Sequence, residues 1–195
     1  MAGGETEQRS GGTGLQKSRT PDVPVHDAKG RNAPRAGHAP ATVHKGTNYM
    51  VVSQTIEVET EDAPDFIDLT DLVADVVAVS GVSAGQVLVF SQHTTAAIKI
   101  NENEPLLLRD ITHFLDRAAP KDAYYGHNDF AIRTVNMHED ECPNGHSHCQ
   151  HLLLGSSETI PVVDAKLAMG RFQRLFLVEL DMPKSRTVIV QVMGV

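Results

Sequence analysis

The chain has 195 residues, 41% hydrophobic and 22% charged, which suits one domain with its own core and a short appendage. A net charge of −8 argues against broad nucleic-acid binding, because contacts to phosphates need clustered cations. No apolar run approaches the roughly 18 residues of a membrane span, and we expect no membrane partner and no secretory leader. Two cysteines, Cys142 and Cys149, make no disulfide framework, so a reducing, cytoplasmic setting is expected.

The first 48 residues differ from the rest in composition and charge. They hold seven Lys/Arg and four Asp/Glu, whereas residues 49–195 hold ten and twenty-one. The segment is rich in Gly, Pro, Ser, Thr and Ala and has no aromatic residue, so it cannot bury enough surface to offset its ordering entropy. We expect a disordered basic tail over residues 1–48 and one folded domain over residues 49–195.

The folded part is expected to begin with a strand and a helix. In YMVVSQTIEVET, alternate positions are mostly apolar, which predicts a strand. In LTDLVADVVAVSGV, leucine and valine recur at helical spacing. We expect Thr70 to cap the start of this helix and Gly81 to end it.

The stretch SQHTTAAIKINE is the most informative. If it is one extended strand, Ala96 and Ile98 face the core and a polar row lies on the opposite face. The members of that row are His93, Thr95, Lys99 and Asn101. Glu102 follows at the strand end, where a carboxylate can reach into a cleft. A solvent-facing sheet surface is the alternative, but histidine and carboxylate at strand ends are the usual parts of proton-transfer or metal sites.

A second helix is predicted over residues 103–120. Pro105 suits its first turn, and Pro120 ends it. Its apolar stripe consists of Leu107, Ile111, Phe114 and Leu115. Residues 121–150 are polar and irregular, and a loop of this length in a compact domain is usually functional or disordered.

Three histidines and two cysteines crowd the stretch ECPNGHSHCQH. If it is a strand, His146 and His148 point the same way and Cys149 points away, so these groups cannot converge on one tetrahedral zinc. A structural zinc knuckle and a crowded loop therefore remain weaker alternatives. The better prediction is a metal site in which this His-x-His pair is joined by His93 or His127 from elsewhere.

The last third of the chain predicts strands in SSETIPVVDAKL, FQRLFLVELD and RTVIVQVMGV, separated by the turn-like VDAK and DMPKS. We therefore expect an α+β fold: compact and β-rich, mostly antiparallel sheet with two helices. The GSSET turn around Ser156 and the cations Lys184 and Arg186 could bind an anion, although solvated side chains are the simpler interpretation.

The order of these motifs resembles the YjbQ family, an uncharacterised protein family whose members are often labelled secondary thiamine-phosphate synthase enzymes. The resemblance covers Tyr49–Val195. It implies a compact β-rich YjbQ-like fold that assembles as a homotrimer, with the motif residues in a cleft near subunit contacts. The catalytic residues it implies are His93, Thr94, Asn101, Glu102 and His148. The substrate or anion ligands it implies are Gln173 and Arg186, to which we add Ser156 of the GSSET turn as an expected anion ligand. A divalent metal, Zn or Mg, is expected on His127, His148 and His146.

Two places depart from the family pattern. Phe172 stands where the family usually has Trp before Gln173, and it still supplies an aromatic wall. In the turn that is DGPR in the family, Met182 replaces Gly and Lys184 replaces Arg. Met does not take the positive φ that Gly allows without strain, and Lys lacks the bidentate fork of Arg. This turn and its role in phosphate binding are therefore expected to differ.

The resemblance implies an enzyme that joins a pyrimidine diphosphate to a thiazole phosphate and releases pyrophosphate. This would be a weak, secondary activity beside an unknown primary reaction on a phosphorylated small molecule. Metal ions or cations would stabilise the leaving diphosphate. The alternative is a non-catalytic trimeric module that binds a small anion or a metal. We favour the enzyme, because several histidines beside a carboxylate suit proton transfer near neutral pH.

Overall fold

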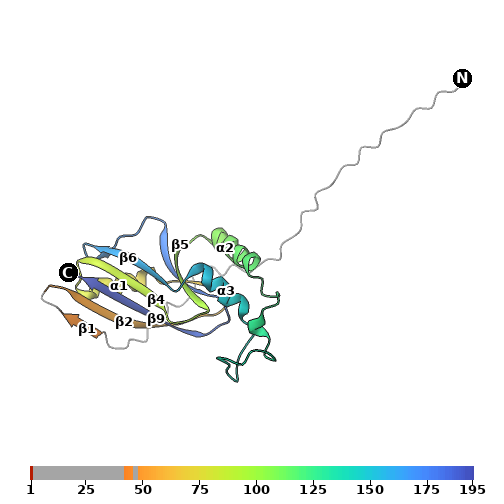
Figure 1. The fold of residues 1–195 in the computed structure, drawn as a ribbon. Helices are drawn as coiled ribbons and strands as arrows, with labels where there is room; N and C mark the ends of the chain where they lie inside the picture. Colours follow the sequence, from red (N-terminus) through yellow and green to blue (C-terminus); the bar gives the residue numbers. More distant parts are fainter. Residues whose placement is uncertain (2–41, 46–47) are drawn as a thin grey trace.

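The computed structural model describes residue 1, residues 42–45 and residues 48–195, and its strands form two antiparallel sheets (Figure 1). The large sheet has the order β1 (Thr42–Lys45), β2 (Met50–Glu59), β9 (Ser185–Gly194), β4 (Ala84–Ser91), β6 (Ser157–Val163) and β7 (Lys166–Leu167). The small sheet has the order β3 (Asp65–Asp68), β8 (Gln173–Glu179) and β5 (Ala96–Glu102). The chain is thus α+β and β-rich, as the sequence predicts.

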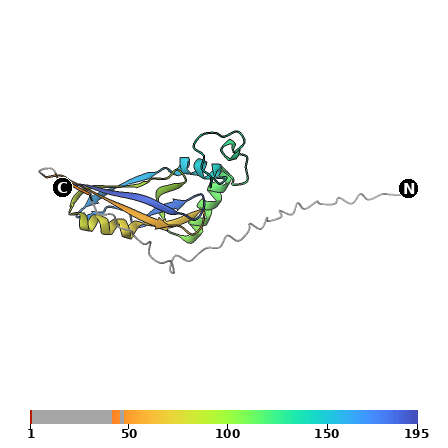
Figure 2. The ribbon, with the colours of Figure 1, turned by 90° about the horizontal axis from the view of Figure 1, so that it is seen from below.

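Within the described residues, three α-helices and one 3-10 turn accompany the sheets. They are α1 (Thr70–Ser80), α2 (Pro105–Ala118), η1 (Gly126–Asn128) and α3 (Gly145–Leu154). In Figure 2, α1 runs along the long strands, whereas α2 and α3 gather at the end of the domain away from the C-terminus. No helix among the described residues is long and apolar enough to cross a membrane.

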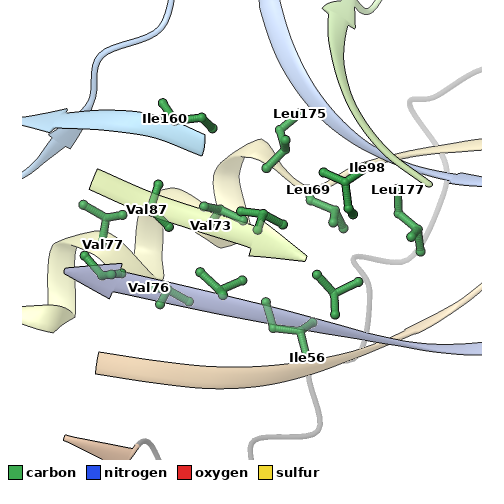
Figure 3. Close-up of a cluster of buried hydrophobic side chains, with 14 of the residues drawn as sticks. Ile56, Leu69, Val73, Val76, Val77, Val87, Ile98, Ile160, Leu175 and Leu177 are labelled. Atoms are coloured by element: carbon green, nitrogen blue, oxygen red, sulfur yellow. The ribbon is translucent and has the colours of Figure 1, made fainter. Parts of the chain in front are cut away.

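The main core lies between the two sheets and α1 (Figure 3). Val73 and Val77 of α1 and Val87 of β4 are fully buried there, as is Ile56 of β2. Each such side chain stabilises the fold by about 1.5–3 kcal/mol relative to an exposed one. Gly81, in the left-handed conformation at φ 80°, ends α1 as predicted.

The small sheet is buried on both faces. Along β8, Leu175 and Leu177 point into the main core, and Phe176 and Val178 point into a second core with Leu115 of α2. This explains why the β8 sequence is apolar without alternation. The sheet is therefore a rigid middle layer whose two ends are free to carry polar groups.

The structure departs from the sequence predictions in several places besides the histidine stretch. The ordered domain begins earlier than residue 49, because Thr42–Lys45 pairs with β2; the rest of the expected tail lies outside the described residues, apart from residues 1 and 48. Thr70 is the first helical residue and not the cap, since its hydroxyl accepts from the Leu175 amide. Phe114 of the expected stripe is exposed. The predicted loop over 121–150 contains η1 and the start of α3.

A buried ion pair ties the small sheet to the large one. Glu179 ends β8 and Arg186 lies at the start of β9; the Arg186 Nε and Nη2 atoms donate to the two carboxylate oxygens of Glu179. Glu179 also accepts from the Thr60 hydroxyl beyond β2, at 3.3 Å, and from the backbone N–H groups of Leu180 and Asp181. With this many donors, the buried carboxylate is well compensated for its loss of water.

Substituting Glu179→Gln should leave the buried Arg186 charge without its counterion. We expect the free energy of unfolding to fall by about 3–5 kcal/mol, as for other buried pairs that lose one partner. Urea denaturation would measure it. Glu158→Gln, which removes the half-exposed pair with Lys99, is the matched control and should cost less than about 1 kcal/mol. Equal, small losses in both variants would contradict the structural role of the Glu179 pair.

Candidate functional site

Two histidines meet at the end of the domain where α3 begins. His127 of η1 and His148 of α3 lie edge to face, with ring centroids 4.5 Å apart and an angle of 67° between the rings. Both side chains are half-buried. Burial, followed by the nearby His127, lowers the pKa of His148. Two imidazole rings in contact at a partly open surface are suited to exchanging protons near neutral pH.

A close backbone approach brings this pair together. The Gly145 N–H donates to the Asn128 side chain at 2.8 Å, which joins η1 to the start of α3. A Cβ at position 145 would lie 2.6 Å from the Cβ of Tyr125, so a larger residue would push η1 away. Gly145 is therefore required for the contact between His127 and His148.

The prediction that the His-x-His stretch is a strand is wrong. It forms α3, in which residues two apart project on nearly opposite sides. His146 consequently points into the protein, 5% exposed, with its Nε2 atom 3.2 Å from the Ser147 hydroxyl. The expected metal set of His127, His148 and His146 is not assembled. Within residues 42–45 and 48–195, no three His, Cys, Asp or Glu side chains are placed to hold a metal ion.

Behind His127 lies a chain of polar contacts that the sequence analysis did not identify. The Nε2 atom of His127 is 3.1 Å from Oδ1 of Asn144, and Nδ2 of Asn144 donates to Asp181 at 3.4 Å. Lys184 donates to the same Asp181 oxygen at 2.6 Å. Burial opposes ionisation of Asp181, but the hydrogen bonds from Lys184 and Asn144 outweigh it and lower the pKa of the carboxyl. Asp181 is therefore a buried, ionised anchor.

His93 lies nearby in the loop between β4 and β5 and not in a strand. The Thr187 N–H donates to its Nε2 atom at 2.7 Å. Because Nε2 accepts, the neutral ring must carry its proton on Nδ1. Burial and the positive charge of Arg186 lower the pKa of His93. His93 is thus an uncharged donor through Nδ1, whereas Thr94, expected beside it in catalysis, is exposed.

Arg186 holds this loop from the interior of the protein. It is 4% exposed, and besides its pair with Glu179 it donates to the hydroxyl of Thr95. Its charge is balanced inside the protein. We therefore assign it to holding the His93 loop and not to direct contact with a solvent-borne anion.

A second polar cluster occupies the opposite end of the small sheet. Glu102 ends β5 and pairs in register with Gln173, the first residue of β8. Beside them, the Arg171 guanidinium lies 5.2 Å from the centre of the Phe172 ring. An open cleft of about 390 Å³ is lined by Ile100, Asn101, Glu102, Gly170, Arg171, Phe172 and Gln173.

The expected catalytic residues are therefore divided between two ends of one sheet. The seven residues of β5, at about 3.3 Å each, separate the His93 loop from Glu102 by about 20 Å. The structure brings His127 and His148 together at one end, and Asn101, Glu102 and Gln173 at the other. Ser156 joins neither group, since its hydroxyl contacts the His151 ring at 3.2 Å.

Three of the cations near the histidines are paired with carboxylates. Lys184 is bound to Asp181, Arg186 to Glu179, and Arg133 to Glu141 at 3.0 Å. The carboxylates compensate these charges, and burial favours the neutral form of His93 and His148. These three cations are therefore not free to bind a multiply charged anion on their own.

The comparisons with known proteins point to one family. A family model described as UPF0047 protein YjbQ-like matches residues 54–195. A UPF0047 protein of Methanothermobacter thermautotrophicus is 40% identical over 149 residues, which are 76% of this chain and 96% of the relative. A solved YbjQ-like protein of unknown function from Sulfolobus solfataricus is 33% identical, with a TM-score of 0.68 over 75% of this chain and 99% of its own. A hypothetical protein from Aeropyrum pernix is 31% identical, with a TM-score of 0.65 over 73% of this chain and 98% of its own.

Acid should weaken the fold through its buried histidines. Burial lowers the pKa of His146 below the usual 6.5, and its Nδ1 atom has no hydrogen-bond partner among the described residues. The unfolded chain therefore binds a proton at His146 more tightly than the folded chain does. The contribution of His146 to the free energy of unfolding is complete above pH 6.5 and is lost as the pH falls through the folded-state pKa. We expect the free energy of unfolding, measured by urea titration, to decrease below pH 6.5.

The variant His146→Leu should make that decrease shallower, because one titrating group is removed. His138→Gln is the control, since His138 is exposed and its substitution should leave the slope unchanged. The same pH dependence in the wild type and in His146→Leu would show that His146 titrates alike in both states.

Proposed function

The chain belongs to the YjbQ-like UPF0047 family, and from this premise we propose that it is an enzyme that transfers protons on a phosphorylated small molecule. The observation that carries the proposal is the contact between His127 and His148 beside a buried, ionised carboxylate. A purely structural surface has no need for two touching imidazoles with a polar network behind them. General acid–base groups with a pKa near the working pH contribute about 10²- to 10⁴-fold to a rate.

Each histidine has a distinct part in this proposal. His127 and His148 exchange a proton with the substrate close to its phosphate group. His93, held neutral by the Thr187 amide, donates a hydrogen bond from Nδ1 to a substrate oxygen. Because burial lowers the pKa of His148 and favours its neutral form, this ring can accept a proton without first losing one.

We propose thiamine-phosphate synthesis as a secondary activity of the same site. In that reaction the bond from the pyrimidine methylene carbon to the diphosphate oxygen breaks, the thiazole nitrogen bonds to that carbon, and pyrophosphate leaves. The leaving group needs unpaired cations, whereas Lys184, Arg186 and Arg133 are bound to carboxylates. This supports a slow reaction, in which one histidine of the pair first takes up a proton from solvent and then passes it, as imidazolium, to the leaving oxygen.

Any divalent metal, Mg or Zn, is proposed to arrive with the phosphorylated substrate. Catalytic zinc usually has three protein ligands, and the described residues provide no such group of three. Mg²⁺ is commonly carried by substrate phosphates with one or two carboxylates. The metal would then be part of the substrate, and the proton transfers would use the protein's own side chains.

Assembly as a homotrimer is proposed to complete the site. The histidine end and the Glu102 end lie about 20 Å apart along β5, too far for one small substrate. A neighbouring subunit could bring its Glu102 end, with the 61% exposed ring of Phe172, to the histidine pair.

The free thiols of Cys142 and Cys149 support the reducing cytoplasm as the compartment.

Replacing the histidine pair should abolish the secondary reaction. Purified protein given the pyrimidine diphosphate, the thiazole phosphate and Mg²⁺ should release pyrophosphate slowly, followed by phosphorus NMR. We expect His127→Gln and His148→Asn to lower the rate about 100-fold, because each removes a proton-transfer group. His138→Gln, an exposed histidine in the same segment, should keep the full rate.

Two results would count against this function. Unchanged turnover in both variants would remove the histidine pair from the mechanism. Saturable binding of phosphorylated compounds without turnover of any of them would favour the non-catalytic binding module.

A further inference from the structure

Asn144 is a buried amide placed between two groups with different hydrogen-bonding needs. It is 8% exposed, with its oxygen toward His127 and its nitrogen toward Asp181. An amide side chain has one donor end and one acceptor end, so its orientation determines what each neighbour must do. Asn144 can therefore transmit a preference from Asp181 to His127.

Asp181 sets this preference because an ionised carboxylate accepts hydrogen bonds but has none to donate. Lys184 donates to its Oδ2 atom and the Cys142 thiol donates to Oδ1 at 3.5 Å, so both carboxylate oxygens act as acceptors. If Asn144 were rotated by half a turn, its carbonyl oxygen would face a buried carboxylate and repel it. The donor end of Asn144 therefore belongs at Asp181, and its acceptor end belongs at His127.

We propose that Asn144 and Asp181 are positioning residues that hold His127 as the tautomer protonated on Nε2. The Asn144 oxygen accepts the Nε2 proton, which leaves the lone pair of the neutral ring on Nδ1. Nδ1 is then the atom of His127 that accepts a proton. This inference rests on the proposed function only for its catalytic meaning, since the tautomer itself follows from the contacts.

The segment around His127 is restrained as well. Arg133 donates from Nη1 to the His127 carbonyl at 3.3 Å and to Glu141 at 3.0 Å. The hydrogen bonds of Arg133 with Glu141 lower the pKa of Glu141, despite an opposing contribution from burial. Because the backbone of His127 is held while Asn144 orients its ring, the position of the Nδ1 lone pair is fixed before a substrate arrives.

The nitrogen chemical shifts of the histidine rings test this proposal directly. The full-length wild-type protein, labelled with ¹⁵N in histidine, would be measured at about pH 8, where neutral histidine is expected. We expect His127 to show a protonated Nε2 and an unprotonated Nδ1. His93 provides the internal comparison, because its Nε2 atom accepts from Thr187 and the opposite tautomer is required.

Two substitutions should disturb only His127. Asp181→Asn lets Asn144 rotate, and Asn144→Leu removes the amide; each should shift the His127 tautomer ratio about five-fold, the effect of one hydrogen bond. His93 should keep its tautomer in both variants. The wild-type spectrum alone decides the matter if a variant does not fold.

A wild-type His127 protonated mainly on Nδ1, or a ratio unchanged in both folded variants, would overturn the proposal. The two claims fail separately. The predicted tautomer in a protein whose turnover survives His127→Gln would leave the positioning intact and remove the function. The opposite tautomer in a protein whose turnover needs His127 would remove the positioning and leave the function intact.

Discussion

The buried pair of Glu179 and Arg186 is the constraint on which the histidine site depends. It joins the end of β8 to the start of β9, and the Glu179 carboxylate also accepts from the backbone N–H of Asp181. Asp181 in turn orients Asn144, which contacts His127. On the other side, burial and then the charge of Arg186 lower the pKa of His93, and Arg186 supports the His93 loop through Thr95. A buried salt bridge is weak evidence of net stability, but this one fixes the geometry of two separate histidines.

The sequence predicted the elements whose burial follows a simple period. The alternation in β2 and the start of α2 at Pro105 were predicted correctly, although Phe114 of the predicted α2 stripe is exposed. Helix α3 was missed, because its buried face consists of Gly145, His146, Ser147 and Gln150 and therefore carries no apolar period. The polar positions were found from motif order, but Asn144 and Asp181 were not, since a contact across 37 residues leaves no local signal.

The same contrast explains why one predicted site became two clusters. His93 precedes β5 and Glu102 ends it. Because the two residues are close together in the sequence, the motif suggests a single site. An extended strand instead puts them about 20 Å apart, at opposite ends of a sheet that is buried on both faces. Such a sheet does not bend to close the distance. The proposed catalytic carboxylate must therefore come from another subunit, or else the two clusters serve different purposes.

Mixing two variants, each of which a shared site would leave inactive, tests this account most directly. Glu102→Gln and His148→Asn would be purified separately, dissociated, mixed and reassembled, and pyrophosphate release would be measured. If the site is completed by a neighbouring subunit, mixed assemblies contain some sites with both native residues, and activity should return to a substantial fraction of the wild-type rate. If the mixture stays as inactive as its parts while wild-type protein survives the same treatment, the shared site is contradicted.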